Sequence, residues 1–195
     1  EVVFNCMESL IPEYSAFGVV REPAGSALPG IAPSDAYVCT DGWVLVAGNG
    51  DSIFKRLMDA IGRPDLGQAS ELANNAGRVA RVQELDAAIG AWTALRTVQQ
   101  VLDVLAAARV PAGRVYTAKD IHEDPHYRAR GMLQLQETRD GYTVEVPGIV
   151  PKLSATPGTI RSSAPRLGED TDAVLREAGL TEAQIARLRE KGVVA

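Results

Sequence analysis

The stretch AYVCTDGWVLVA, residues 36–47, decides the fold, because it consists of two β-prone runs around one Asp-Gly pair. The runs are residues 36–40 and 43–47, and Asp41-Gly42 lies between them. Asp-Gly in this setting is a strong short-range signal for a hairpin, since the favoured two-residue turn needs positive φ at both central residues. The sequence therefore predicts an antiparallel hairpin that turns at Asp41 and Gly42.

Three amphipathic stripes follow the hairpin, each with the 3- and 4-residue spacing of a helix. Asp51 is expected to cap the first helix, and Gly62 and Pro64 end it. Thr97 and Gln100 form a capping box for the third. We expect all three helices to cover one sheet. Their apolar residues are Ile53, Phe54, Leu57, Met58 and Ile61 in the first, Val79, Val82, Leu85, Ile89 and Trp92 in the second, and Val101, Leu102 and Leu105 in the third.

The second half of the chain carries another hairpin signal and two more helices. The runs 133–138 and 142–146 flank Asp140-Gly141 and predict a second hairpin. Residues 152–165 are rich in Pro, Gly and Ser without a period, which predicts an extended connection. Two short helices end the chain, the last with a capping box of Thr181 and Gln184. The predicted fold class is α+β, with β-hairpins packed by helices.

The first 34 residues combine a short apolar run, a helical stripe and a long loop. We expect a short buried strand at residues 2–5, and then an apolar helix at residues 7–17 that Pro12 weakens or bends. Residues 21–34 show almost no periodicity and predict a loop of a length that is usually functional or mobile. Gly25 and Gly30 would allow this loop to lay backbone N–H groups against an anion or a thioester, and a plain connection is the alternative.

Composition places the chain among ordinary globular proteins and disfavours several partners. Of its 195 residues, 46% are hydrophobic and 23% are charged, and the net charge is -5. No basic field exists to hold a nucleic acid, and no apolar run approaches the roughly 20 residues that a membrane span needs. Cys6 and Cys39 are too few for a disulfide framework, so the cytoplasm is the expected compartment.

Residues 122–126, HEDPH, match the H-E-x-x-H pattern of zinc peptidases, and Glu145 lies at a plausible distance for a third ligand. The pattern binds zinc only when both histidines project from one face of a continuous helix. Pro125 between them removes a helical hydrogen bond and clashes with the preceding turn. We therefore expect no metal site, and interpret Asp124 as the N-cap of a short helix that Pro125 begins and Gly131 follows.

Other polar residues do not assemble into a catalytic constellation. Glu169, Asp170 and Asp172 stand at the start of a helix, where carboxylates suit the positive end of the helix dipole, and we interpret them as capping groups. The serines of the 152–165 connection and its surroundings lack a histidine or a nucleophile-elbow motif. The residues alone therefore predict no catalytic group in this chain.

A series of short motifs runs through nearly the whole chain, and in this order they resemble the C-terminal half of one enzyme family. They are Glu8 within residues 1–10, PGIAP at 29–33 with Tyr37 and DGW at 41–43, IGRPDL at 61–66, NAGR at 75–78 with ELD at 84–86, VPAG at 110–113, DPH at 124–126 with RGM at 130–132, and AP at 164–165 with LGEDTD at 167–172. The family is the family III CoA-transferases, which includes formyl-CoA transferase and the carnitine and bile-acid CoA-transferases.

The resemblance implies acyl-group chemistry on coenzyme A thioesters. In this family an aspartate of an N-terminal Rossmann-like domain attacks the donor thioester, and CoA passes to the acceptor acid through an aspartyl-CoA intermediate. This chain opens at Glu1 without an initiator Met, so we expect it to be a C-terminal portion that lacks the aspartate. The implied partners are acyl-CoA and a small carboxylic acid, with no covalently bound cofactor, and the implied assembly is an interlocked homodimer.

The family's glycine-rich loop, which closes over the intermediate, aligns with residues 24–30, here AGSALPG. We call these residues the glycine loop. The resemblance implies that Gly25, Ser26, Ala27 and Gly30 contact the CoA thioester. The departure from a glycine-rich pattern favours an acid substrate other than that of formyl-CoA transferase. An acyl-CoA racemase of the same family and a non-catalytic assembly module are the alternatives.

The resemblance also implies a division of the chain into three parts. Residues 1–35 would be the end of the large domain and the connecting glycine loop, and residues 36–131 a small α+β domain. Residues 132–195 would hold the second hairpin, the return linker and the C-terminal helices.

Overall fold

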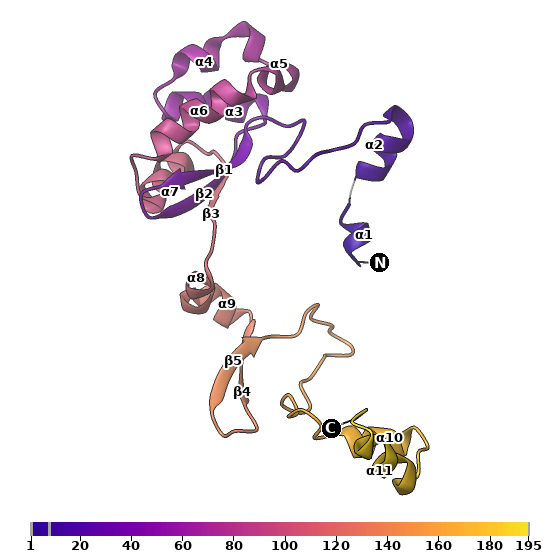
Figure 1. Cartoon of the computed structure of the whole chain (residues 1–195). Coiled ribbons are helices and arrows are strands. Elements are labelled where there is room, and N and C mark those ends of the chain that lie inside the picture. Colours follow the sequence, from indigo (N-terminus) through magenta and orange to yellow (C-terminus); the bar gives the residue numbers. More distant parts are fainter. Residues whose placement is uncertain (1, 8, 195) are drawn as a thin grey trace. The chain divides into compact units, whose positions relative to one another are not determined.

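The computed structural model describes residues 2–7 and 9–194 (Figure 1). Contacts divide the chain into two compact units, residues 1–115 and 116–195, and each is described by itself. Residues 116–131 thus group with the second unit. The predicted boundaries at 35 and 131 concern the domains of a longer family fold, and they stay predictions. Glu8, one of the residues behind the resemblance, lies outside the described residues.

The first residues form two helices, α1 (Val2–Asn5) and α2 (Leu10–Phe17). The strand predicted for residues 2–5 is wrong. A strand needs a neighbour for its backbone, and the sheet of the first unit contains only later segments. Phe4 is 64% exposed, whereas the prediction made this run buried. Pro12 does not break α2, because it lies in the first turn, where backbone N–H groups have no intrahelical acceptor.

The first unit contains a three-stranded antiparallel sheet in the order β1 (Ser34–Cys39), β2 (Gly42–Ala47), β3 (Ala112–Arg114). The predicted hairpin is confirmed, but its turn is shifted by one residue. Cys39 pairs with Gly42, so the turn is centred on Thr40 and Asp41, and neither has positive φ. The Asp41 carboxylate instead accepts the backbone N–H of Val98 at 2.7 Å, at the start of a later helix.

Six helical segments lie between β2 and β3 in the sequence. They are α3 (Asp51–Ala60), α4 (Pro64–Gln68), the 3-10 turn η1 (Ser70–Leu72), α5 (Asn75–Ala80), α6 (Val82–Thr93) and α7 (Val98–Ala107). Figure 1 shows α6 and α7 beside the sheet, with α4 and α5 farther from it.

The predicted packing of helices against one sheet is confirmed for α3, α6 and α7, because one buried cluster joins them to β1 and β2. Its largest members include Tyr37, Val44, Val46, Phe54, Leu57, Met58, Leu85, Ile89, Val101 and Leu105. The second predicted stripe does not lie on one helix, since Val79 belongs to α5 and the rest of the stripe to α6.

Two capping predictions in the first unit have different outcomes. Thr97 and Gln100 form the predicted capping box at the start of α7. Asp51, however, is not the cap of α3: the N-cap is Gly50, and Asp51 is the first helical residue. Its carboxylate accepts a hydrogen bond from the Arg78 guanidinium at 2.8 Å. A partner 27 residues away in the sequence replaces the local backbone contact.

The second unit contains α8 (Ala118–Glu123), α9 (Pro125–Ala129), the hairpin β4 (Leu133–Glu137) and β5 (Thr143–Pro147), α10 (Thr171–Glu177) and α11 (Glu182–Glu190). The second predicted hairpin is confirmed, with Gly141 at positive φ in its turn. Thr181 and Gln184 form the predicted capping box of α11. Residues 152–165 contain no helix or strand, as predicted for a connection.

Glu169, Asp170 and Asp172 stand at the start of α10, and two of these three carboxylates bind arginines. Asp170 occupies the N-cap position, yet its side chain makes no capping hydrogen bond. Asp172 pairs with Arg189 at 2.8 Å, and Glu169 with Arg139 at 3.4 Å. The predicted capping role is therefore wrong for the Asp170 side chain.

No helix in the described part of the chain combines the length and apolar character needed to cross a bilayer.

Candidate functional site

The glycine loop precedes β1 and contains two residues in left-handed conformation. Gly25 has φ of 65° and Gly30 has φ of 81°. A Cβ added at either glycine would meet no other atom within 4 Å. The sequence suggested that glycine is needed here for close approach of another group, but within this chain the requirement is conformational, because L residues rarely adopt positive φ.

The middle of the loop is held by a side-chain bond and a short turn. Ser26 Oγ donates to Asp35 Oδ1 at 2.5 Å, and this bond is exposed. The backbone N–H of Ala27 donates to the carbonyl of Ala24, and that of Leu28 donates to the carbonyl of Ser34. The turn gives residues 24–28 a defined path, although most of this segment is exposed to solvent.

The C-terminal end of the loop is held by two side chains of α5. Asn75 Nδ2 donates to the carbonyl of Gly30 at 2.9 Å, and Asn75 Oδ1 accepts the N–H of Ala32 at 3.1 Å. Arg78, one turn further along α5, donates from Nε to the carbonyl of Ala32 at 3.0 Å. Three backbone polar groups within residues 30–32 thus have side-chain partners more than 40 residues away.

Arg78 is 0% exposed and connects three separate segments. Besides Ala32, its guanidinium donates to the carbonyls of Leu72 and Asn49 and to the carboxylate of Asp51. Its charged end also lies 5.1 Å from the ring centre of Phe54. A buried guanidinium is tolerated only when its donors are satisfied, and here the acceptors are three backbone carbonyls from separate segments and one carboxylate.

A pocket of about 240 Å³ lies between the glycine loop and helices α5 and α6. Residues 27–32 and Ala24 form the loop side, and Val79, Val82 and Asp86 form the helix side. Of the four predicted contact residues, Ala27 and Gly30 line this pocket, whereas Gly25 and Ser26 do not. The lining is mostly apolar, with Asp86 as its single charged group.

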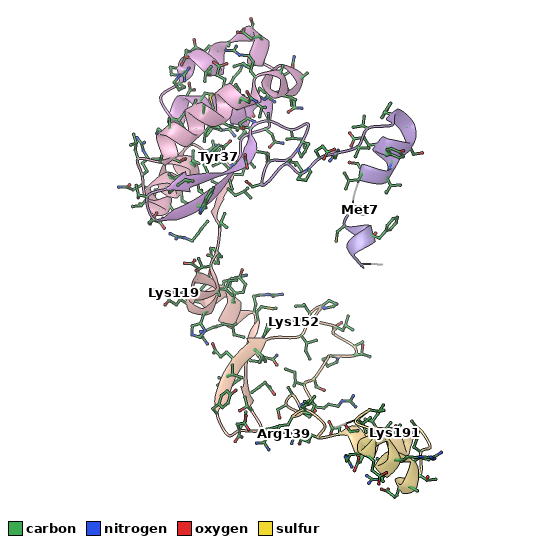
Figure 2. The ribbon with its side chains drawn as sticks, viewed as in Figure 1. Met7, Tyr37, Lys119, Arg139, Lys152 and Lys191 are labelled. Carbon is green, nitrogen blue, oxygen red and sulfur yellow. The ribbon has the colours of Figure 1, made fainter. Side chains whose placement is uncertain are left out.

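Asp86 is paired with Tyr37, which lies on the β1 face that packs against the helices (Figure 2). The Tyr37 hydroxyl donates to Asp86 Oδ1 at 2.6 Å. Partial burial raises the pKa of the Asp86 carboxyl, and this hydrogen bond partly opposes the change. Burial, together with the nearby Asp86 charge, raises the pKa of Tyr37 well above its usual value. The hydroxyl therefore remains a hydrogen-bond donor at neutral pH.

The helix break expected in the HEDPH segment is confirmed. α8 ends at Glu123, Asp124 accepts the N–H of His126 at 2.7 Å as an N-cap, and Pro125 begins α9. His122 and His126 thus lie on different helices. Within residues 2–7 and 9–194, no three side chains of the His, Cys, Asp and Glu types are grouped as a metal would require. The expected absence of a bound metal stays a prediction.

Glu145, the third candidate ligand, lies on β5 and binds Arg128 and His122. Arg128 Nη1 lies 2.6 Å from Glu145 Oε1, and His122 Nδ1 lies 2.8 Å from Glu145 Oε2. The Arg128 guanidinium lowers the pKa of the Glu145 carboxyl. This arrangement is a surface ion pair that ties α9 to the hairpin.

Sequence reasoning did not single out Asn75, Arg78 or Asp86, which occur above only inside motifs of the resemblance. The available signal is weak: Arg78 directly precedes Val79, the first residue of the second predicted apolar stripe, and nothing local shows that it is buried. Its partners are 6 to 46 residues away.

Comparison with known proteins identifies the family. The sequence model of CoA-transferase family III matches residues 1–171. The chain is 39% identical over its whole length to the succinyl-CoA–D-citramalate CoA-transferase of Chloroflexus aurantiacus, and 37% identical to the succinyl-CoA–L-malate CoA-transferase beta subunit of the same organism. In both comparisons it spans 49% of the relative's length.

A solved structure agrees with the sequence comparisons. The crystal structure of a CAIB/BAIF family protein from Brucella suis matches 89% of this chain and 44% of that chain, with a TM-score of 0.70 and 28% identity. The likeness thus extends through most of the chain, in both sequence and fold. The chain belongs to CoA-transferase family III.

Proposed function

We propose that the protein containing this chain is a CoA-transferase that moves CoA from succinyl-CoA to a small dicarboxylic acid. The observation that carries the proposal is that the match to two succinyl-CoA-dependent transferases extends over the whole chain. Their acceptors, D-citramalate and L-malate, are both 2-hydroxy dicarboxylic acids. An acceptor of this chemical type is therefore the first to test.

The proposed reaction is covalent exchange through an enzyme carboxylate. An aspartate carboxylate attacks the thioester carbonyl, the C–S bond breaks, and CoA leaves as a thiolate while a mixed anhydride of the aspartate and the donor acid forms. The thiolate then attacks the aspartyl carbonyl, which releases the donor acid and forms an aspartyl-CoA thioester. The acceptor carboxylate repeats these steps in reverse order. We place the aspartate in the half of the family fold that this chain does not span.

In this proposal the glycine loop contributes Gly25, Ser26, Ala27 and Gly30 to the binding of the thioester. Two features support this role: the exposed path of the loop, and the two glycines at positive φ. A loop that closes over a reactive thioester excludes water and so prevents its hydrolysis. We also propose that the protein acts in the cytoplasm as an interlocked homodimer, and the exposed Phe17, Tyr14 and Ile11 of α2 are suited to packing against another surface.

The direct test is an exchange assay on the full-length protein. Purified protein is incubated with succinyl-CoA and either D-citramalate, L-malate or a panel of other carboxylic acids, and the new acyl-CoA is measured by mass spectrometry. We expect transfer by the full-length protein and only background exchange by this chain alone, because in this proposal the attacking carboxylate lies outside the chain. Absence of transfer to every acid would contradict the proposal, and exchange of the α-proton of a 2-methylacyl-CoA would favour a racemase.

Replacing Gly25 by valine in the full-length enzyme should lower kcat by about tenfold or more and change the KM for succinyl-CoA much less. Valine is strained at positive φ, so the loop would favour another path and close poorly. Steady-state kinetics measures both constants. Gly62→Val is the matched control, because Gly62 also has positive φ and open space but lies at the end of α3. A rise in KM with unchanged kcat would contradict a closure role.

A further inference from the structure

The two ends of the glycine loop are attached in different ways. Residues 24–28 have their own turn, the exposed side-chain bond from Ser26 to Asp35, and one backbone bond from the Leu28 N–H to the carbonyl of Ser34. At the other end, α5 binds the carbonyl of Gly30, which is at positive φ, and both the N–H and the carbonyl of Ala32, whereas the Ile31 N–H donates back to the carbonyl of Leu28. Gly30 is therefore the boundary between a lightly held segment and a firmly held one.

The firm attachment comes from the position of one amide side chain. Asn75 is the first residue of α5, so its side chain is free of the helix backbone and points across to the loop. Its side-chain amide makes one hydrogen bond of each kind with the loop backbone: it donates to the carbonyl of Gly30 and accepts from the N–H of Ala32. A single asparagine thus provides the pair of bonds that a neighbouring β-strand would provide.

Arg78 makes this attachment rigid. It binds the carbonyl of Ala32 from the same helix, and it is itself fixed by Leu72, Asn49 and Asp51. The loop end is therefore bound to a part of the first unit that cannot shift without breaking several buried hydrogen bonds. Because the Gly30 carbonyl and both backbone polar groups of Ala32 are bound to α5, motion of the loop is restricted to residues before Gly30.

We infer that Asn75, supported by Arg78, is a positioning residue that fixes the end of the glycine loop, so that closure of the loop pivots at Gly30. The inference rests on the proposed function of the loop in closing over a CoA thioester. Asn75 touches neither the thioester nor the acid in this mechanism. It acts through the backbone of residues 30–32.

The first measurement needs no activity. Amide hydrogen exchange at Ala32 is measured by NMR in this chain and in its Asn75→Ala variant. Loss of the bond to Asn75 Oδ1 should speed exchange at Ala32 by about fivefold or more. Asn75→Asp keeps an acceptor for Ala32 and loses the donor to Gly30, so exchange at Ala32 should stay close to that of the parent.

The neighbouring Asn74 offers a matched control. Asn74 caps α5 locally by accepting the N–H of Gly77 at 3.0 Å, and it has no bond to the loop. Asn74→Ala should therefore lower the melting temperature and leave exchange at Ala32 within about twofold of the parent. Equal acceleration in the Asn74 and Asn75 variants would show general loosening of α5 and would overturn the inference.

The second measurement is steady-state kinetics of the full-length enzyme. Asn75→Ala and Asn75→Asp should both lower kcat by about ten- to a hundredfold, with little change in the KM for succinyl-CoA, because a misplaced loop end impairs closure. Unchanged exchange in Asn75→Ala, or faster exchange with unchanged kcat, would overturn the positioning role. If the unaltered enzyme transfers no CoA, the proposed function fails, whereas exchange at Ala32 still decides whether Asn75 holds the loop.

Discussion

Arg78→Met should lower the free energy of unfolding of the first unit by about 3–5 kcal/mol, because it removes the cationic partner of the buried carbonyls of Ala32 and Leu72 and of the part-buried carbonyl of Asn49 while nearly keeping the side-chain volume. The guanidinium donates to the carbonyls of Ala32, Leu72 and Asn49, and these would lose their partners together. Each buried acceptor left without a donor costs about 1–3 kcal/mol. The Asp51 carboxylate adds less, because its side chain is 66% exposed and water can replace the lost bond.

Tryptophan fluorescence during urea unfolding is the suitable measurement. The chain has two tryptophans, Trp43 and Trp92, and both belong to the first unit. Arg81→Met is the matched control, since Arg81 lies three residues further on and pairs with Glu71 and Glu84 at the surface. Exposed ion pairs contribute about 0–1 kcal/mol. If Arg78→Met and Arg81→Met lowered the free energy of unfolding by similar amounts, the buried hydrogen bonds of Arg78 would not be the cause of the loss.

Gly77→Ala should destabilise the first unit by about 3 kcal/mol, although alanine is normally the better helix former. Gly77 lies in the first turn of α5, and a Cβ added there would overlap the carbonyl oxygen of Glu71 and lie 2.9 Å from its carbonyl carbon. Both atoms belong to the backbone, so no side-chain rotation relieves the clash. The N-cap bond from the Gly77 N–H to Asn74 would be lost when the helix end moves away.

Gly90→Ala is the matched control for Gly77→Ala. Gly90 lies inside α6, and the nearest atom to an added Cβ is Tyr37 Cδ1 at 4.0 Å. Alanine fits there, so the substitution should raise the free energy of unfolding by about 0.5–1 kcal/mol through the lower backbone entropy of the unfolded chain. Opposite signs for the two variants, measured by the same fluorescence assay, are the expected result. Equal effects would show that helix propensity alone governs both positions.

The elements predicted from the sequence were those set by local patterns. The two hairpins, the apolar stripes of α3, α6 and α7 and the capping boxes at Thr97 and Thr181 depend on residues within one or two turns of each other. The strand predicted for residues 2–5 failed because a four-residue apolar run does not distinguish a strand from a short helix. No periodicity can develop over so short a run.

The wrong assignments for aspartates have a common physical cause. Asp41 and Asp51 both stand where a local turn or cap is plausible, and both bind groups far along the chain instead. The partner of Asp41 is 57 residues away and that of Asp51 is 27 residues away. A carboxylate binds the strongest donor that the tertiary fold brings near, and a sequence pattern shows only the nearby donors.

The candidate site was predictable in part for the same reason. Gly25 and Gly30 are visible because glycine has a distinctive backbone, and both do adopt positive φ. Asn75 and Arg78 are ordinary helix residues in the sequence, and their importance arises only when residues 30–32 pass close to α5. Hydrogen bonds from a side chain to the backbone of a distant loop follow no fixed spacing in the sequence, so the sequence pattern does not predict them.

Three separate chain segments bind the Arg78 guanidinium, and this restricts how the chain can vary in length during evolution. Ala32, Asn49 and Leu72 each present one carbonyl to the same guanidinium, so an inserted or deleted residue next to any of them would withdraw an acceptor from a buried cation. Insertions are tolerated where backbone groups face water, as in residues 19–23 before the glycine loop. Homologues should therefore differ in length in that segment and keep fixed spacing between the three acceptors and Arg78.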